Sequence, residues 1–510
     1  MTRRYVLAHD LGTTGNKAVL YDQNGRMAGS ATVAYATEYA HPGWAEQDPE
    51  DWWRAVCDST RRLLHEADVA PSELACVAFS GQMMGCVPVD RRARPLRKAI
   101  IWADQRAVAQ ERWVAERVAP ADVYRITGHR LSASYSLCKL LWLRDHQSEV
   151  YRSAHKFLHA KDAMIARLTG AFVTEPSDAS GTNLYDLMNG SWSAPIVDAL
   201  GLNSEQLPSL RRSIDVVGEV SAEAAEQAGL ALGTPVVAGG GDGPCAATGA
   251  GVVREGAAYN YIGASSWIAL ASRQPIWDPA QRTFTFGHVV PGMMMPTGTM
   301  QAAGTSYQWA RDQLCHLERN QAESVGESVY ALMDEAARRS PPGANGLLFL
   351  PYLLGERSPR WNPRARGAFV GLTIRHTHSD MVRSVLEGVT LNLRVILCAL
   401  QAQGAGIEAV RLIGGGARGR FWNQLMADVY GLPVQRMAVL EEATSMGAAV
   451  IGGVGVGLYS DFSMAEQMNE AAETFWPNPA DRAVYARLAP IFESAYDGLL
   501  PVFDALSASG

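Results

Sequence analysis

Two glycine-rich turns that each carry an aspartate constrain this chain more than any other feature of its sequence. Asp10 opens the turn DLGTTGNK directly after the apolar run 5–8, and Asp242 lies in GGGDG directly after the run 234–238. Short apolar runs bounded by glycine are typical of buried strands. The turns are more than two hundred residues apart, so we expect two separate strands whose acidic ends face one cleft.

The length of the chain predicts more than one domain. Its 510 residues exceed the roughly 250–300 residues at which a single hydrophobic core stops growing. A hydrophobic content of 47%, a charged content of 19% and 48 glycines are typical of a packed α/β protein with many sharp turns. We therefore expect two domains of roughly two hundred residues or more, with a cleft between them.

Charge and cysteine usage argue against several classes of protein. A formal net charge of −7 does not suit a nucleic-acid-binding protein, which needs a basic face. The seven cysteines occur singly, without a C-x-x-C pair, which argues against a disulfide or zinc framework. The N-terminus lacks the apolar core of a signal peptide, and no uninterrupted apolar stretch approaches the ~20 residues that span a bilayer. We expect a cytoplasmic protein without nucleic-acid or membrane partners.

Hydrophobic periodicity divides the chain into two strand-and-turn series. The first covers residues 4–35, with a hairpin step at Asn24-Gly25. A buried strand over 74–81 and a helix from Asp104 to about Arg117 follow it.

The second strand-and-turn series begins near Ala257 and echoes the layout of the first. A long helix over 385–400, a strand that ends before Gly414 and a helix that begins near Phe421 follow it. We therefore place the domain boundary within 250–256, which gives domains 1–253 and 254–510.

The turn at Asp10 has the residue types of a phosphate site. Its glycines let the backbone expose successive N–H groups, and Thr13, Thr14 and Lys17 add hydroxyl and ammonium donors. Phosphoryl transfer also needs a metal ion near the phosphates, and Asp10 is the candidate ligand of magnesium. A plain β-turn with a capping aspartate explains the same pattern.

Asp242 is the candidate general base. Four of the five positions in GGGDG are glycine, so a ligand can approach the backbone closely. Transfer of a phosphoryl group to a hydroxyl needs one carboxylate that accepts the proton of the attacking group. The alternative is an aspartate that caps a helix beginning at Pro244, and the two roles are compatible.

A third glycine-rich loop, 414–419, contains G-x-G-x-x-G between an expected strand and an expected helix. A dinucleotide fold uses such a loop, with Glu441 or Glu442 on a ribose. A nucleotide kinase of another fold would lay adenosine against the glycines, with Asn423 near the base. The pattern leaves both interpretations open, whereas the absence of G-x-x-x-x-G-K-[ST] argues against a P-loop enzyme.

Two segments between the aspartates are candidates for a substrate pocket. FSGQMMGCVPVD (79–90) ends a buried strand, and AIIWADQR (99–106) follows it. Gln82 offers polar groups to a polyol, and Trp102 offers an apolar face to its carbons. For Met83, Met84 and Trp102, the alternative is ordinary core.

The spacing Tyr135-x-x-x-Lys139 matches that of short-chain dehydrogenases. It lies in the apolar segment SYSLCKLLWL, which favours a helix with a core face and a surface face. We assign no chemistry to these two residues.

Taken together, these motifs resemble those of the FGGY family of carbohydrate kinases, in the sugar kinase, hsp70 and actin superfamily, and most closely its xylulokinase branch. The similar segments span nearly the whole chain. They are DLGTTGNK, SGQMMG followed by PLRKAIIWADQR (95–106), KDAMIARLTGAFVTEPSDASGTNLYDL (161–187), GGGDG, YIGASSW (261–267), GLLFLPYLLGERSPRWNPRARGAFVGL (346–372) and LIGGGARGRFWNQLMADVYGLPV (412–434).

The resemblance implies an α/β fold of two ribonuclease-H-like domains, of the actin and hsp70 ATPase type, with an interdomain cleft. It implies ATP and Mg²⁺ as cofactors, a sugar held mainly by the first domain and ATP held mainly by the second. The site residues that it implies are Asp242 for catalysis; Gln82, Met83, Met84, Trp102 and Asp242 for the substrate; Thr13, Thr14, Lys17, Gly263, Ser265, Gly415, Gly416 and Asn423 for ATP; and Asp10 for the metal.

Three positions depart from the xylulokinase pattern. A typical member has histidine where this chain has Met84, and asparagine where it has Ala103 and Gly243. Each change removes a polar group that could meet a ketose hydroxyl, and a buried unpaired hydroxyl costs about 1–3 kcal/mol. D-xylulose is the first hypothesis for the acceptor. Another pentulose, a polyol such as erythritol or glycerol, and an autoinducer-2-type diketone stay open, as do an NAD-dependent oxidoreductase and a homodimer.

Overall fold

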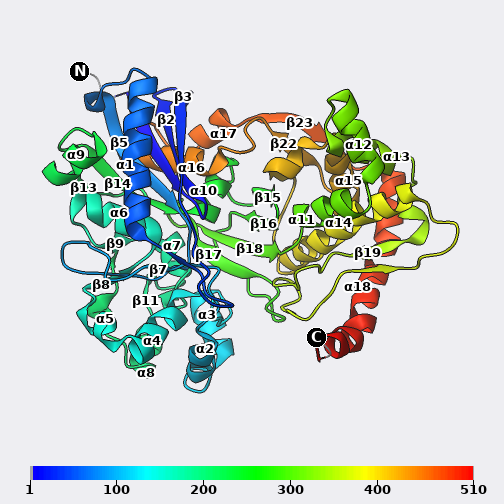
Figure 1. Ribbon diagram of the computed structural model, residues 1–510, viewed down its shortest axis with the longest axis horizontal. Coiled ribbons are helices and arrows are strands. Elements are labelled where there is room, and N and C mark those ends of the chain that lie inside the picture. Colours follow the sequence, from blue (N-terminus) through cyan, green and yellow to red (C-terminus); the bar gives the residue numbers. More distant parts are fainter. Residues whose placement is uncertain (1–3, 509–510) are drawn as a thin grey trace.

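The computed structural model describes residues 4–508 and contains two large mixed β-sheets with helices packed against them (Figure 1). The first sheet has six strands in the order β13-β14-β5-β1-β2-β3, in which β1, β5 and β14 are parallel. Its strands are β1 (Tyr5–Leu11), β2 (Gly15–Asp22), β3 (Met27–Ala34), β5 (Leu74–Gly81), β13 (Val216–Glu219) and β14 (Pro235–Gly241).

The second sheet has seven strands in the order β17-β18-β16-β15-β21-β22-β23, in which β15, β21 and β22 are parallel. The strands of this sheet are β15 (Ala258–Ile262), β16 (Ser266–Leu270), β17 (Phe284–Gly287), β18 (Met294–Met300), β21 (Val410–Ile413), β22 (Val434–Met437) and β23 (Ala471–Phe475). The two predicted strand-and-turn series therefore both form, and each opens one of the large sheets.

The alternation of side chains along β1 and β5 supplies two apolar faces for the first sheet. Leu7 and Phe79 pack in one buried cluster with α1 (Pro49–Glu66) and α6 (Ala160–Thr169). Their neighbours Val6 and Ala78 pack in a second cluster, on the opposite face, because successive side chains of a strand point to opposite sides. All eight residues of β5 are buried, as is typical of a parallel strand covered on both faces.

The second face of this sheet is covered by α10 (Asp242–Gly249) and by α16 (Ala443–Gly455), which comes from far along the chain (Figure 1). Glycines allow the close packing. A Cβ at Gly452 would lie 2.8 Å from Cβ of Ala78, and a Cβ at Gly447 would lie 1.9 Å from the carbonyl oxygen of Cys245. A segment of the C-terminal half is thus part of the core around the first sheet.

The helix predicted over 104–117 begins later than expected, as α2 (Val108–Ala115). Asp104 is fully buried, and its carboxylate accepts hydrogen bonds from the N–H of Ala45 and from Nε of Arg106. These contacts hold the segment before α2 in a non-helical turn.

The remaining elements include α11 (Gly304–Gln313), α14 (His378–Ala402) and α15 (Arg420–Tyr430), which pack in the main buried cluster of the second sheet. The other helices are α3 (Pro120–Thr127), α4 (Ser136–His146), α5 (Ser148–Ser153), α7 (Pro176–Ser180), α8 (Ala194–Ala199), α9 (Ala222–Ala228), α12 (His316–Val325), α13 (Val329–Arg338), α17 (Met464–Met468) and α18 (Pro479–Ala508). The short strands are β4 (Glu46–Gln47), β6 (Val87–Val89), β7 (Ala99–Ile100), β8 (Lys156–Leu158), β9 (Val173–Thr174), β10 (Tyr185–Asp186), β11 (Ser191–Trp192), β12 (Ser209–Leu210), β19 (Leu348–Leu350) and β20 (Ala368–Val370).

One helix of the described residues, α14, is long and apolar enough to cross a membrane. Of its most apolar stretch, 72% is buried inside the protein. Burial to this extent is typical of a helix in the core of a protein.

Candidate active site

The two aspartates that the sequence singles out lie at the same edge of the first sheet. The register pairs both Asp10 of β1 and Gly240 of β14 with Ser80 of the central strand β5. Asp242 follows at once, as the first residue of α10. The carboxyl ends of parallel strands meet at one edge, and Asp10 lies near enough to raise the pKa of Asp242.

Asp242 has the environment of a carboxylate that can take up a proton near neutral pH. Burial and the charge of Asp10 are the main causes that raise its pKa to about 7. Its Oδ1 accepts one hydrogen bond, from the N–H of Gly243 at 2.8 Å. The cap residue of α10 is Gly241, so Asp242 is the first residue within the helix and not its cap.

A buried charge cluster lies behind Asp242. Ser177 connects the two, because its Oγ accepts the N–H of Gly241 at 2.9 Å and donates to Glu175 at 2.6 Å. The cation of this cluster is Lys161, whose Nζ lies close to three buried carboxylates: Asp162 (2.6 Å), Asp178 (3.3 Å) and Glu175 (3.6 Å). Hydrogen bonds through Ser177 therefore anchor the loop of Asp242 to the buried charge cluster.

Asp10 is half-buried, and burial raises its pKa to about 6 against the nearby charge of Lys17. Nζ of Lys17 lies 3.4 Å from Oε1 of Glu442, a residue of the C-terminal half. Two neighbouring carboxylates with raised pKa values form an oxygen-rich site in which a divalent cation would offset the charge.

The turn between β1 and β2 is closed by a hydrogen bond from the N–H of Gly12 to the carbonyl of Gly15, 3.0 Å. Thr13 is half-buried and Thr14 is exposed. Oγ1 of Thr13 accepts Nε1–H of Trp102 at 3.0 Å. The predicted phosphate turn and the predicted substrate tryptophan are therefore in direct contact.

Gln82 lies directly beyond β5, with only 3% of its surface exposed. Its Nε2 donates to Oε1 of Gln47 at 2.8 Å, and Nε2 of Gln47 donates to the carbonyl of Thr13 at 2.6 Å. Oε1 of Gln82 is buried and has no hydrogen-bond partner within residues 4–508. Gln47 thus joins the Thr13 turn to Gln82, and the sequence patterns did not single it out.

The two methionines after Gln82 have different surroundings. Met83 is 4% exposed and packs in an apolar cluster with Phe284 and Phe286, so its side chain is part of the core. Met84 is half-buried and has a φ of 61°, a left-handed conformation that is uncommon for residues other than glycine. Trp102 keeps 37% of its surface exposed.

Two loops of the second sheet lie side by side, because β15 and β21 are parallel neighbours. Gly263 and Ser265 form the hairpin after β15, with the Gly263 N–H bonded to the Ser265 carbonyl at 2.9 Å. The glycine loop after β21 approaches that strand closely, since a Cβ at Gly414 would lie 2.6 Å from the carbonyl oxygen of Ile262. The predicted phosphate hairpin and the predicted glycine loop therefore share one edge.

Gly415 and Gly416 form a short helical turn after β21. A Cβ at Gly415 would meet no atom within 4 Å, so the backbone there is open to a ligand. Asn423 is fully buried in α15, and its Nδ2 donates to the carbonyl of Ala417 at 2.8 Å. The asparagine therefore lies behind the glycine loop and holds it.

Family models match most of the chain. Residues 5–249 match the N-terminal domain of the FGGY family of carbohydrate kinases, and residues 258–456 match its C-terminal domain. The chain belongs to the FGGY family of carbohydrate kinases. It is therefore an ATP-dependent phosphotransferase for a carbohydrate, and ATP is a substrate.

The relatives of this FGGY kinase carry several substrate names. It is 33% identical to "Xylulose kinase" of Staphylococcus epidermidis over 97% of each chain. It is also 31% identical to "Autoinducer-2 kinase" of Klebsiella pneumoniae, over 98% of this chain and 95% of the relative.

The structures of ligand-bound xylulose kinase and of gluconate kinase from Lactobacillus acidophilus each superpose with a TM-score of 0.91. Each is 29% identical to this kinase, over 98% of this chain and 99% of the other. The predicted α/β fold of the actin and hsp70 type is confirmed. Family membership also favours the kinase over the NAD-dependent oxidoreductase for the loop 414–419, and Glu441 pairs there with Arg418.

Proposed function

We propose that this FGGY kinase transfers the γ-phosphoryl group of ATP to a primary hydroxyl of a small ketose, with D-xylulose as the first candidate and D-xylulose 5-phosphate as its product. The observation that carries the proposal is the pair of neighbouring carboxylates, Asp10 and Asp242, at the edge where three parallel strands end. The full-length similarity to xylulose kinases supports the acceptor. Another pentulose, a polyol and an autoinducer-2-type diketone are the alternatives.

Asp242 acts as the general base in this proposal. Its carboxylate takes the proton of the acceptor hydroxyl, the hydroxyl oxygen bonds to the γ-phosphorus, and the bond from that phosphorus to the β,γ-bridging oxygen breaks to release ADP. Asp10, beside it, suits Mg²⁺, which prefers carboxylate oxygens and neutralises phosphate charge.

The acceptor pocket in this proposal lies beyond β5. Gln82 has a buried oxygen without a partner, which suits a sugar hydroxyl, and Trp102 offers its exposed face to the sugar carbons. Met84 borders the pocket, while the buried Met83 supports it from the core.

The phosphates of ATP are assigned to the two hairpins. Thr13, Thr14 and Lys17 approach them from the first sheet, and Gly263 and Ser265 approach them from the second. Open backbone at Gly415, next to Gly416, takes the adenosine, and Asn423 acts on it through the loop that it holds.

We further infer the cell context and the domain division. The boundary falls between the two sheets, near residue 253. Of domain 254–510, α16 packs on the first sheet, and the rest closes with domain 1–253 on the substrates and excludes water. The seven cysteines are free, which suits the reducing cytoplasm. A homodimer is compatible with this kinase.

The pH dependence of the reaction follows from the raised pKa of Asp242. The base must be ionised, so kcat/KM for the acceptor is expected to rise with pH through an apparent pKa of about 7 and to level off above it. Initial rates between pH 5.5 and 8.5 at saturating ATP test this. A flat profile over that range would contradict a base with this environment.

Gly414→Ala is expected to weaken ATP binding. Gly414 has a φ of 87°, and the added Cβ would press on the backbone of Ile262, so the glycine loop must shift. We expect the KM for ATP to rise at least about tenfold, with a smaller change in the KM for the acceptor. Gly406→Ala is the matched control, since its Cβ would meet no atom within 4 Å. Equal KM values for ATP in the two variants would refute the assignment.

The substrate is tested by ADP release from ATP and magnesium over a panel of acceptors. The panel contains D-xylulose, L-xylulose, D-ribulose, L-ribulose, erythritol, glycerol, gluconate and a linear diketone, with a blank that lacks acceptor. Selective stimulation by D-xylulose supports the proposal. Stimulation by another acceptor alone keeps the kinase and rejects the substrate.

A further inference from the structure

Lys139 of α4 is fully buried, although the sequence placed it on a helix with a core face and a surface face. Its Nζ donates to the carbonyl of Met84 at 2.6 Å and to the carbonyl of Ser134 at 2.5 Å. It forms no ion pair with any of residues 4–508, and Asp104, which acts on it from a distance, pairs with Arg106.

The environment of Lys139 is unfavourable for an ammonium group. Burial lowers its pKa to about 7, because the lost hydration outweighs the distant charge of Asp104. A buried amine that is held only by backbone carbonyls is costly. The two carbonyls that Lys139 contacts, of Met84 and Ser134, therefore offset part of this cost.

Met84 needs an external contact to keep its conformation. Its φ of 61° is a strained region for a residue with a Cβ, and such strain persists only where the surroundings impose it. The next carbonyl, of Gly85, accepts Oγ–H of Ser136 at 2.7 Å. Lys139 and Ser136 lie on the same helix, so α4 holds two consecutive carbonyls of the loop 83–85.

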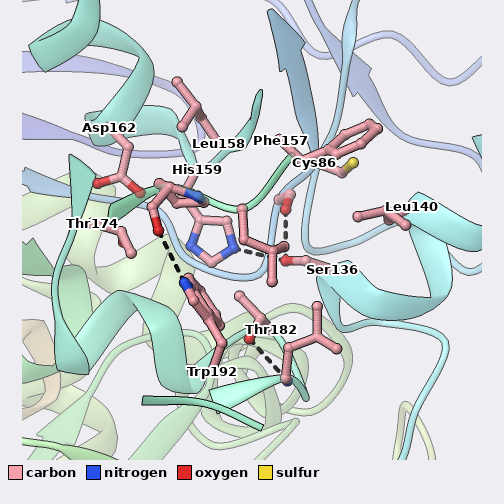
Figure 2. Close-up of a pocket in the computed structure, with 14 residues that line it drawn as sticks. Cys86, Ser136, Leu140, Phe157, Leu158, His159, Asp162, Thr174, Thr182 and Trp192 are labelled. Carbon is pink, nitrogen blue, oxygen red and sulfur yellow. Dashed lines mark hydrogen bonds between the residues drawn. The ribbon is translucent and has the colours of Figure 1, made fainter. Parts of the chain in front are cut away.

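Ser136 is itself held from the other side. Its Oγ lies 2.7 Å from Nε2 of His159 (Figure 2). On the far side of the imidazole ring, Nδ1 of His159 lies 2.5 Å from Oδ1 of Asp178. These three residues have the connectivity of a nucleophilic triad. The cavity beside them measures only ≈ 20 Å³, about the space of one water molecule, and the Ser136 hydroxyl is committed to Gly85. The arrangement therefore anchors Ser136 and leaves no room for a substrate.

We propose that α4 positions the acceptor sugar through Lys139 and Ser136, which fix the backbone of the loop 83–85. Lys139 imposes the left-handed conformation of Met84, and Ser136 fixes Gly85. Both are positioning residues, since they act through the loop and contact no substrate. The inference rests on the proposed function, which places this loop at the acceptor pocket.

Lys139→Met tests the first anchor. Loss of the hydrogen bond to the Met84 carbonyl releases the loop, so the KM for the acceptor is expected to rise about tenfold. The KM for ATP and the ATP hydrolysis without acceptor stay unchanged. Lys156→Met is the matched control, because Lys156 also donates to two carbonyls, of Glu205 and Leu207, away from this loop.

A double-mutant cycle separates positioning from simple support of the fold. Glycine adopts the Met84 conformation without strain. The factor by which Lys139→Met raises the acceptor KM is therefore expected to be several-fold smaller in a Met84→Gly background than in the wild type. An equal rise in both backgrounds would overturn the proposal. If Lys139→Met does not fold, Ser136→Ala decides: an unchanged acceptor KM in that variant overturns the proposal as well.

The reaction of the wild type distinguishes a failure of the proposed function from a failure of the positioning role of α4. If no acceptor stimulates ADP release by the wild type, the proposed function fails. If the wild type phosphorylates an acceptor and both α4 variants keep its KM, only the positioning role of α4 fails.

Discussion

Asp242→Asn is expected to lower the turnover of the acceptor-dependent reaction about 10²–10⁴-fold, the usual contribution of a general base. The amide cannot take the proton of the acceptor hydroxyl, while the loops that we assign to ATP are unchanged. The KM for ATP should therefore stay within about twofold of the wild type. Turnover is measured by coupled ADP release at saturating acceptor.

Asp198→Asn is the control for this variant, because Asp198 is an exposed aspartate of α8. It should leave turnover unchanged. Near-normal turnover in Asp242→Asn would remove Asp242 from the mechanism and leave Asp10 as the next candidate.

Asp242→Asn is also expected to be more stable than the wild type at neutral pH. An unfolded aspartate has a pKa of about 4, and the folded pKa of Asp242 is about 7. Ionisation therefore destabilises the folded state progressively as pH rises from about 4 to about 7. Asparagine lacks this cost, so the gain in melting temperature should be larger at pH 8 than at pH 5.

The second large effect concerns Lys161, the buried cation behind Asp242. Lys161→Met would remove the ammonium that lies close to three buried carboxylates, of which only Asp178 also contacts a histidine, His159, among the described residues. Breaking a buried ion pair from one side costs about 3–5 kcal/mol, so we expect a large loss of unfolding free energy or no soluble protein. Denaturant unfolding followed by tryptophan fluorescence measures it.

Lys98→Met is the matched control for Lys161, because Lys98 pairs with Glu38 at the surface, with 39% and 56% of the two side chains exposed. Exposed pairs contribute about 0–1 kcal/mol. Equal stability of the two lysine variants would contradict the account of the cluster. His159, Asp162 and Asp178 also have metal-ligand types, yet the ammonium of Lys161 already supplies the positive charge there.

The sequence predicted which residues of the candidate site lie where a strand ends. Asp10, Gln82 and Asp242 each follow an apolar run, and glycines mark the turns at the two aspartates. The parallel register of β1, β5 and β14 then brings them together. Local patterns suffice for such residues, because strand direction alone decides where they lie.

Other parts of the site depend on contacts that no local pattern encodes. Gln47 joins two distant segments through hydrogen bonds with Gln82 and with the carbonyl of Thr13. Lys139 donates to the carbonyl of Met84, 55 residues away in the sequence. Hydrophobic periodicity does not predict a buried lysine in an apolar helix, since a single charged residue is expected on the surface. The return of α16 to the first sheet was unpredictable for the same reason.

Following the γ-phosphoryl group itself tests the assignment of Asp242 as the base of a sugar kinase. Wild type and Asp242→Asn are incubated with ATP, magnesium and D-xylulose, and the products are identified by ³¹P NMR and mass spectrometry. We predict a sugar monophosphate from the wild type in equal amount to ADP, and only traces of it from the variant. Release of ADP and inorganic phosphate without any phosphorylated acceptor across the panel would contradict the account.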